Sequence, residues 1–173
     1  MNKSTLNPVQ PQASKDNGDG KPTAPKRSLT PRRRAREYAL QGVYQSLVVR
    51  RAGSLPNSAA IAKQLAEDPA FKRCQLDLFN GIFQGVLERT DELEAIITPA
   101  LDRPINELSP VEHAALLIGT YELAADLSVP YKVAINEAVE LAKTFGGTDG
   151  HKYVNGVLDL LAQKLRAAET QAG

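Results

Sequence analysis

The sequence contains few of the residues that form cross-links, metal sites and reactive centres. Its 173 residues include one cysteine, Cys74, and two histidines, His113 and His151, and tryptophan is absent. A single cysteine excludes an internal disulfide, and two histidines with one cysteine are too few for the usual structural zinc sites. We therefore expect a chain that folds by packing alone, with neither a metal nor another cofactor.

Long hydrophobic runs are also missing. No stretch approaches the ~20 apolar residues that a membrane-spanning helix needs. The first residues, MNKSTLNPVQPQASKDNGDG, lack the apolar centre of a signal peptide. Both absences favour a cytoplasmic protein that makes no membrane contact.

Charge is unevenly distributed along the chain. The net charge is +1, yet residues 1–36 hold nine of the 21 lysines and arginines and only two of the 20 acidic residues. The rest of the chain is correspondingly acidic. A basic arm on a mildly acidic body is typical of a protein that meets a polyanion at one end.

The pattern of apolar residues predicts one helical domain. Residues 1–29 contain four prolines and few large apolar side chains, so they have too little hydrophobic surface to offset the entropy lost on ordering. From Thr30 onward apolar residues recur with helical spacing, and no strand pattern is followed by a hairpin turn and a partner strand. We expect an all-α fold, a compact bundle of about seven short helices over residues 30–168, with a disordered N-terminal tail (1–29) and a disordered C-terminus (169–173).

Capping residues predict where several of these helices begin. Thr30 opens a first helix that runs to about residue 51, and a third helix is expected from Phe71. Ser109, with Glu112 three residues later, forms a capping box before an apolar run. Asp149 is expected to cap the last helix.

No arrangement of side chains in the sequence predicts catalysis. His151 lies two residues from Asp149, but both are expected at the start of a helix, where Asp149 is the cap. Cys74 has no histidine nearby in sequence and is expected to be a packing residue. The glycine-rich segment 146–150 follows no strand and lacks a Gly-Lys-Ser/Thr, which argues against a nucleotide-binding loop. We therefore predict that the protein is not an enzyme.

An arginine cluster is the strongest functional signal in the sequence. Arg32, Arg33, Arg34 and Arg36 fill the first turns of the first helix, where the helix dipole disfavours cations by roughly 0.3–1 kcal/mol each. Such a concentration of guanidinium groups is typical of phosphate binding. The alternatives are a solvated helix start, or one that pairs with the acidic body.

The position of Tyr44 favours RNA as the phosphate-containing ligand. Arg32 and Arg36 are four residues apart and are expected on one side of the helix, and Tyr44 lies two turns further along near that side. An aromatic ring in such a position can stack on an unpaired base. No clear helix-turn-helix pattern for duplex DNA is present, so single-stranded RNA is the predicted ligand.

Three segments give the sequence a family resemblance. The segments RRRAREYALQGVYQ, VPYKVAINEAVELAKTFGG and HKYVNGVLD resemble the family of the transcription antitermination factor NusB, over roughly residues 30–165. The resemblance implies a small all-helical RNA-binding factor that pairs with NusE, a small-subunit ribosomal protein, on the boxA element of ribosomal RNA transcripts. It also implies that this complex joins RNA polymerase and other Nus factors to suppress premature termination.

The resemblance assigns roles to individual residues. Those implied in RNA binding are an arginine-rich motif, two aromatic residues and two charged residues near the start of the last helix: Arg32, Arg33, Arg34, Arg36, Tyr44, Tyr153, Asp149 and Lys152. Removing the acid at Asp149 is expected to ease the approach of phosphate. Glu112 is implied at the surface that faces NusE. Residues 53–108 match only loosely, and no RNA contact is carried over to them.

Two alternatives stay open at this point. A helical scaffold, or a homodimeric interaction module without specific RNA binding, has the same kind of surface composition. A similar helical domain is also an accessory domain of certain ribosomal RNA cytosine methyltransferases. Those enzymes carry a separate Rossmann-like domain with a catalytic cysteine, for which we expect no room after residue 168.

Overall fold

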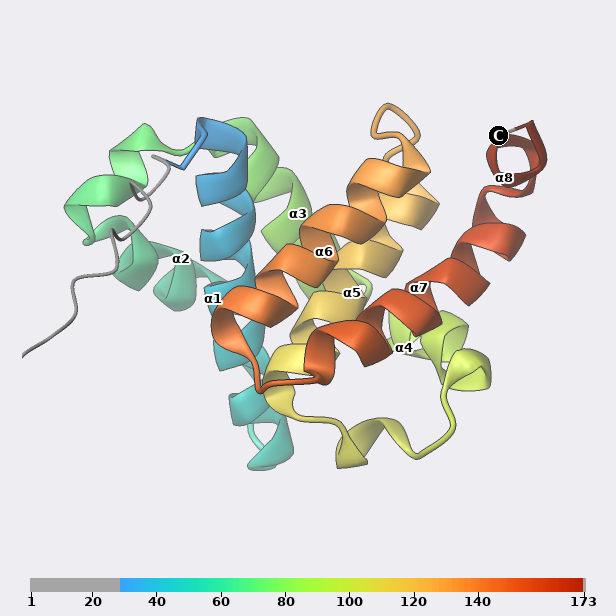
Figure 1. Cartoon of the computed structure of the whole chain (residues 1–173). Helices are drawn as coiled ribbons and strands as arrows, with labels where there is room; N and C mark the ends of the chain where they lie inside the picture. The colour runs from blue at the N-terminus through green and yellow to red at the C-terminus, as the bar shows by residue number, and fades with distance from the viewer. Residues whose placement is uncertain (1–28, 173) are drawn as a thin grey trace, which may run out of the picture.

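Helices make up all of the regular secondary structure in the part of the chain that the structure describes (Figure 1). This computed structural model describes residues 29–172. In that range no helix is long and apolar enough to cross a membrane. The helices are α1 (Pro31–Arg51), α2 (Ser58–Ala66), α3 (Leu76–Glu88), α4 (Thr90–Ile97), α5 (Pro110–Ala125), α6 (Tyr131–Phe145), α7 (Gly150–Leu165) and α8 (Ala167–Ala172). Short 3₁₀ turns lie between them at η1 (Pro69–Arg73), η2 (Thr98–Ala100) and η3 (Ile105–Glu107).

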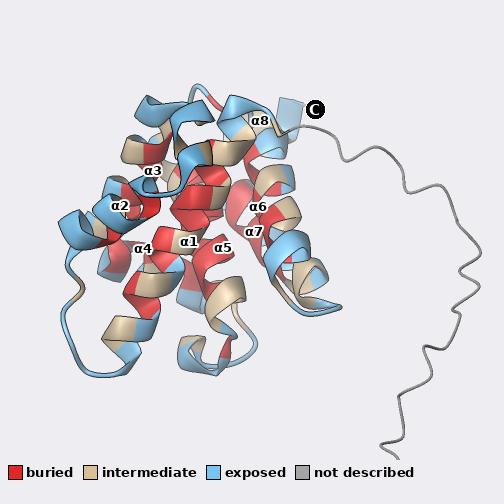
Figure 2. Ribbon diagram, turned by 90° about the vertical axis from the view of Figure 1, so that its left-hand side faces the viewer, coloured by how far each residue is buried: buried red, intermediate tan, exposed pale blue. Residues whose placement is uncertain are grey.

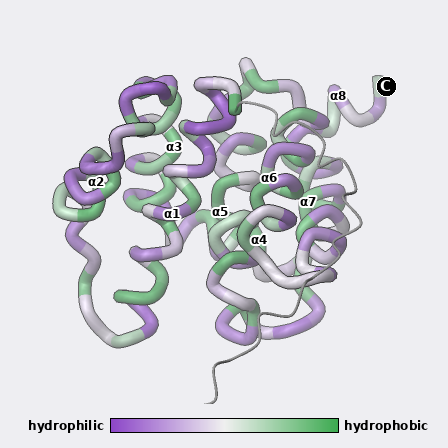
Figure 3. The backbone as a smooth tube through the Cα atoms, turned by 60° about the vertical axis from the view of Figure 1, so that its left-hand side comes forward, coloured by the Kyte–Doolittle hydropathy of each residue, from purple (hydrophilic) through white to green (hydrophobic). Residues whose placement is uncertain are grey.

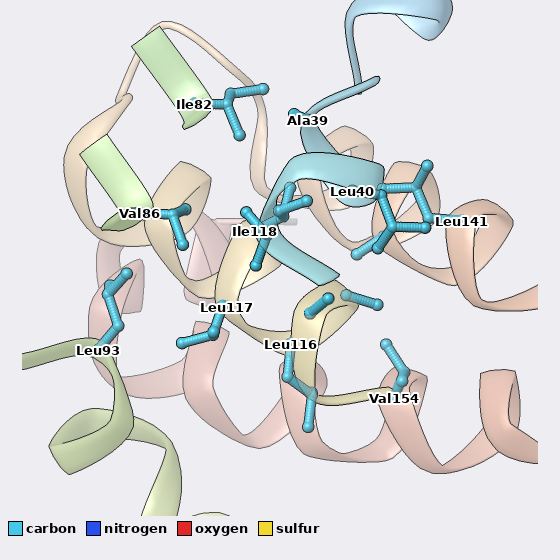
Figure 4. Close-up of a cluster of buried hydrophobic side chains, with 14 of the residues drawn as sticks. Ala39, Leu40, Ile82, Val86, Leu93, Leu116, Leu117, Ile118, Leu141 and Val154 are labelled. Carbon is cyan, nitrogen blue, oxygen red and sulfur yellow. The ribbon is translucent and has the colours of Figure 1, made fainter. Parts of the chain in front are cut away.

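The predicted all-α fold is confirmed, and α5 forms its centre. α5 packs against α1, α4, α6 and α7, and every residue from His113 to Thr120 is buried. Consecutive residues of a helix point in all directions, so burial of each one requires neighbours on every side. Figure 4 shows Leu116, Leu117 and Ile118 among side chains of α1, α3, α4, α6 and α7, and Figure 2 shows the buried residues gathered around α1 and α5.

The outer helices bury one face each. Along α6 and α7, hydrophilic and hydrophobic residues alternate, as expected for helices that lie between the core and solvent (Figure 3). α7 can approach α5 closely because Gly119 has no side chain. A Cβ atom at Gly119 would lie only 2.7 Å from Leu158 Cδ1.

The first helix begins where the sequence predicts. Thr30 is the N-cap of α1, and its Oγ1 accepts a hydrogen bond from the backbone N–H of Arg33 at 3.1 Å. Pro31 is the first helical residue. Beyond the helix end the chain turns at Gly53, whose φ of 83° is a conformation that favours glycine. This start fixes where the arginine motif is presented.

The prediction of a third helix from Phe71 is wrong. The residues around Phe71 form η1, which Asp68 and Pro69 open, and α3 begins only at Leu76. Between them Cys74 is extended, because the next backbone N–H, that of Gln75, donates to Pro31 O at 2.9 Å and holds the chain against the start of α1. Cys74 is half-buried against the core.

The prediction of disorder from residue 169 onward is also wrong for the described residues, which continue into α8 as far as Ala172. The helix is held to the bundle by Glu169, whose carboxylate accepts a hydrogen bond from Tyr131 N at 3.2 Å and pairs with Arg166. The buried Arg166 guanidinium also donates to carbonyl oxygens at the end of α5, including that of Leu123. Apart from Leu29, the predicted N-terminal tail lies outside the described residues.

Candidate nucleic-acid interface

Three arginines of the predicted motif lie at the surface of the first turn of α1. Arg32 is exposed, and its Nη1 donates to Gln75 Oε1 at 3.4 Å. Arg33 is partly exposed and lies 3.4 Å from Glu137 Oε1 of α6. Arg34 is also partly exposed and is in no ion pair within residues 29–172. These guanidinium groups are therefore available to a ligand at this end of the helix.

Arg36 does not belong to this surface, and its prediction as an RNA contact needs correction. Its residue is 2% exposed, and its Nε donates to Glu122 Oε1 of α5 at 3.0 Å. Burial raises the pKa of Glu122, and the charge of Arg36 opposes that shift. Arg36 Nη2 has no hydrogen-bond partner in the described part of the chain. Arg36 thus joins α1 to α5 inside the protein.

The spacing of the inward residues of α1 explains the burial of Arg36. Leu40, Val43 and Leu47 are buried and lie four, seven and eleven residues after Arg36, which is the repeat of one helix face. The periodicity of the sequence therefore held a signal for an inward arginine. Its buried partner, Glu122, lies within the apolar run of α5 and is followed by the buried Leu123.

Tyr44 is 40% exposed and borders a cavity between α1 and the ends of two other helices. The cavity has a volume of about 340 Å³ and is lined by Leu40, Gln41, Tyr44, Gln45, Val111 and Phe145. Phe145, at the end of α6, is 38% exposed. Phe145 is not among the residues predicted from the sequence, because its spacing from Leu141 and Ala138 predicts an inward residue. Two exposed aromatic rings thus line one apolar surface.

Tyr153 of α7 is held by a neighbouring pair of charges. Its hydroxyl group donates to Asp102 Oδ1 at 2.8 Å, and Arg103 Cζ lies 4.5 Å from the centre of its ring. Arg103 Nε also donates to Asp102 Oδ1 at 2.9 Å. The hydrogen bond from Arg103, and then that from Tyr153, lowers the pKa of Asp102. Arg103 lies in the loosely matching middle of the chain, where no sequence signal marks it.

Two of the remaining predicted residues, Glu112 and Asp149, line one cavity beside Tyr153. This cavity, of about 460 Å³, is lined by Arg103, Glu112, Gly147, Thr148, Asp149, Gly150 and Tyr153. The carboxylate of Glu112 lies against Gly150, where a Cβ atom would be 2.6 Å from Glu112 Oε1. Glu112, which is predicted to face NusE, therefore shares a surface with Asp149 and Tyr153, which are predicted to face RNA.

Asp149 occupies the N-cap position of α7, but its side chain accepts no capping hydrogen bond. Its Oδ1 instead lies 3.4 Å from Lys152 Nζ, and both side chains are exposed. Half of the capping box predicted at Ser109 is present: its Oγ accepts from the backbone N–H of Glu112 at 3.1 Å, whereas the Glu112 carboxylate lies against Gly150 and does not accept from Ser109 N. Val111 and Glu112 are consecutive and line the two cavities, so these cavities adjoin at the start of α5.

His113 and Cys74, two groups that could support chemistry, are engaged in the fold. His113 is buried, with Nε2 2.9 Å from Glu94 Oε1 and Nδ1 3.1 Å from Arg51 Nη2. Burial raises the pKa of the Cys74 thiol, which makes the thiolate scarcer. Within residues 29–172, no group of three or more His, Cys, Asp or Glu side chains is arranged to hold a metal ion.

Comparisons with known proteins decide the family. A sequence model of the NusB family matches residues 33–163. The chain belongs to the NusB family. Among similar relatives, the transcription antitermination protein NusB of Burkholderia mallei (strain SAVP1) is 54% identical over 143 residues, covering 82% of this chain and 94% of the relative. That of Ralstonia nicotianae is 49% identical over 159 residues, covering 92% of this chain and 98% of the relative.

Solved structures of NusB proteins share the fold. T. maritima NusB has a TM-score of 0.65 at 30% sequence identity, over 79% of this chain and 94% of that chain. A crystal structure of antitermination factors NusB and NusE in complex with double-stranded RNA has a TM-score of 0.66 at 24% identity, over 76% of this chain and 96% of that chain. The family predicted from the three sequence segments is confirmed.

Proposed function

We propose that this protein is a non-enzymatic, cytoplasmic RNA-binding factor that pairs with NusE on boxA RNA of ribosomal RNA transcripts to suppress premature termination. In this proposal the complex also joins RNA polymerase and other Nus factors. The observation that carries it is the exposed arginine turn of α1 on the same helix as an aromatic-lined surface, in a chain of the NusB family. The relatives are named transcription antitermination proteins, and one similar structure contains NusE and RNA.

The arginine turn supplies the electrostatic part of binding. Phosphate groups of the RNA bind Arg32, Arg33 and Arg34, whose side chains lie wholly or partly at the surface. Each phosphate that is neutralised releases condensed counterions, so affinity falls as salt rises. Arginine suits this task because its planar group offers several donors to phosphate oxygens.

The aromatic residues supply contacts to bases. From Arg32 to Tyr44 the helix rises about 18 Å, at 1.5 Å per residue. A strand bound at the arginine turn and following α1 reaches Tyr44 and Phe145, which border one cavity. Rings at a surface can stack on unpaired bases. Tyr153, fixed by its bond to Asp102, offers a further ring beyond them.

NusE binds at the cavity that contains Glu112 in this proposal. Glu112 shares the cavity with Asp149 and Tyr153, so a protein bound there lies next to the RNA. The two carboxylates repel phosphate in the free protein. A cationic group of NusE placed beside them reduces this repulsion, and RNA binding therefore strengthens when NusE is present.

Fluorescence anisotropy with labelled RNA tests the proposal. The probes are a boxA-like single strand, a scrambled strand of the same composition and a boxA-like duplex, each with and without NusE across a salt series. We expect tight binding of the boxA-like single strand that strengthens when NusE is added. Equal, weak and NusE-independent binding to all probes would overturn the proposal and favour a homodimeric scaffold, which sedimentation of the protein alone would then reveal.

A further inference from the structure

We infer that η1 extends the RNA-binding surface beyond the arginine turn of α1, with Lys72 and Arg73 binding phosphate groups of the same single strand. The inference rests on the proposed function and adds a contact segment from the middle of the chain. It is based on the position of η1, because the green segment that contains η1 lies beside the blue start of α1 in Figure 1.

Hydrogen bonds fix both ends of η1 to α1. After η1, the Gln75 backbone N–H donates to Pro31 O at 2.9 Å, and Arg32 Nη1 donates to the Gln75 side chain at 3.4 Å. Before η1, the Tyr38 hydroxyl group donates to Asp68 Oδ2 at 2.8 Å. The turn is therefore part of the same rigid surface as the arginine motif.

Packing determines which side chains of η1 reach solvent. The Phe71 ring packs edge to face against Tyr38, with ring centres 5.1 Å apart, and against Phe79, with centres 5.0 Å apart. Phe71 thus anchors the inner side of η1 on α1 and α3. Lys72 and Arg73 are exposed.

Four cations on two adjoining segments, the start of α1 and η1, are in no ion pair within residues 29–172. Elsewhere in that range, ion pairs hold Arg50, Arg89, Arg103, Lys143 and Lys152, whereas the exposed lysines Lys63, Lys132 and Lys164, one on each of α2, α6 and α7, are in no ion pair. None of the ion pairs in that range includes Arg32, Arg34, Lys72 or Arg73. A row of unpaired cations is the electrostatic footprint of nucleic-acid binding.

The acidic residue nearest to η1 connects the two cationic segments. The Ala70 backbone N–H and then the Tyr38 hydroxyl lower the pKa of Asp68, and the charges of Arg34 and Arg73 lower it further. Asp68 is therefore close enough to interact electrostatically with both Arg34 of α1 and Arg73 of η1. Its oxygens accept hydrogen bonds from Ala70 N at 2.9 Å and from Tyr38. The carboxylate thereby holds the segments together.

The carboxylates that flank η1 in the sequence lie beyond its two ends. Glu67 follows α2, and Asp77 lies in the first turn of α3, where the helix dipole stabilises an anion. Between them Lys72 and Arg73 continue the line of cations from Arg32. Continuity with the arginine turn favours the RNA strand as the occupant, because Arg32 is hydrogen-bonded to Gln75, which lies two residues after the end of η1.

Anisotropy titrations with RNA of different lengths test the inference. The probes are a boxA-like core strand and two strands lengthened at one end or the other, measured across a salt series with the full chain. We expect one lengthened strand to bind more tightly than the core, with a steeper salt dependence. The double variant Lys72→Ala/Arg73→Ala should lose this gain, with a logarithmic salt slope lower by about 0.7 for each phosphate that is no longer bound, and should bind the core strand as the unaltered protein does.

A charge-matched control and a second variant separate the outcomes. Lys132→Ala/Lys164→Ala removes two exposed lysines of α6 and α7 and should leave the gain intact, and thermal unfolding should show that all variants fold. No gain from either lengthened strand, or a gain that survives in Lys72→Ala/Arg73→Ala, would overturn the inference. Unchanged core binding in Arg32→Ala/Arg33→Ala/Arg34→Ala would instead overturn the proposed function.

Discussion

The two ends of the proposed RNA surface hold their charges in different ways. At the start of α1, Arg32 and Arg34 are in no ion pair within residues 29–172. Near the start of α7, Lys152 lies 3.4 Å from Asp149, and Arg103 is bonded to a carboxylate. In the proposed function the first end attracts phosphate, whereas the second places an aromatic ring among paired charges. The start of α1 therefore supplies electrostatic attraction in that function, and the cavity beside Tyr153 supplies an aromatic ring and the contact with NusE.

The same contrast divides the arginine motif itself. Arg34 and Arg36 are two residues apart, yet Arg34 reaches the surface and Arg36 is buried against Glu122. A sequence pattern that names four arginines as one motif therefore combines two functions. In the proposed function the surface arginines bind the ligand, and the buried arginine fixes the helix that presents them.

The largest effect we predict comes from breaking the buried pair. Arg36→Met should lower the free energy of unfolding by about 3–5 kcal/mol, because it leaves Glu122 buried without its partner. Denaturant unfolding measures this. Arg34→Ala should change stability by no more than about 0.5 kcal/mol, and Arg36→Met/Glu122→Leu should recover most of the stability. If Arg34→Ala destabilised the protein as much as Arg36→Met, the claim that only Arg36 has a structural role would be contradicted.

Next in size is the contribution of Tyr44. Tyr44→Ala should weaken binding of single-stranded RNA by roughly 1–3 kcal/mol, the range for a ring stacked on a base. Tyr44→Phe keeps the ring and should bind nearly as well as the unaltered protein. Anisotropy titrations compare them, with thermal unfolding as a check that the alanine variant stays folded. Equal affinities of the alanine and phenylalanine variants would argue against stacking.

A smaller effect is expected at Glu112. Glu112→Gln removes a charge from the cavity beside Tyr153 and should weaken NusE binding by about 1 kcal/mol, since one partly exposed ion pair is lost. Calorimetric titration with NusE measures this change. RNA binding without NusE should not fall in the same variant. A decrease in RNA affinity without NusE would place Glu112 in the RNA site instead.

The smallest predicted effect has the opposite sign. Asp149→Asn should strengthen RNA binding by up to about 1 kcal/mol at low salt, because the exposed carboxylate no longer repels phosphate. The gain should shrink as salt rises, which a titration series at several salt concentrations would show. Weaker binding of the asparagine variant would mean that the carboxylate itself binds the RNA. The proposed difference between the start of α1 and the start of α7 would then be contradicted.

Local sequence signals predicted much of the fold and part of the site. Thr30 and Ser109 cap helices as expected, since a cap depends on residues within one turn. The break between η1 and α3 was not predicted, because it depends on a hydrogen bond from Gln75 to Pro31, far away in sequence. The pairing of Arg103 with Tyr153 likewise joins distant segments. Arg36 differs, because its helical spacing from Leu40 and Val43 already marked it as inward.

The salt dependence of RNA binding tests the central claim most directly. The slope of the logarithm of affinity against the logarithm of salt concentration should be compared between the unaltered protein and Arg32→Ala/Arg33→Ala/Arg34→Ala, using a boxA-like single strand. If these arginines bind phosphate, the slope should fall by about 0.7 for each arginine that no longer neutralises a phosphate, or about 2 in all. An unchanged slope in a folded variant would contradict the claim that the start of α1 binds RNA.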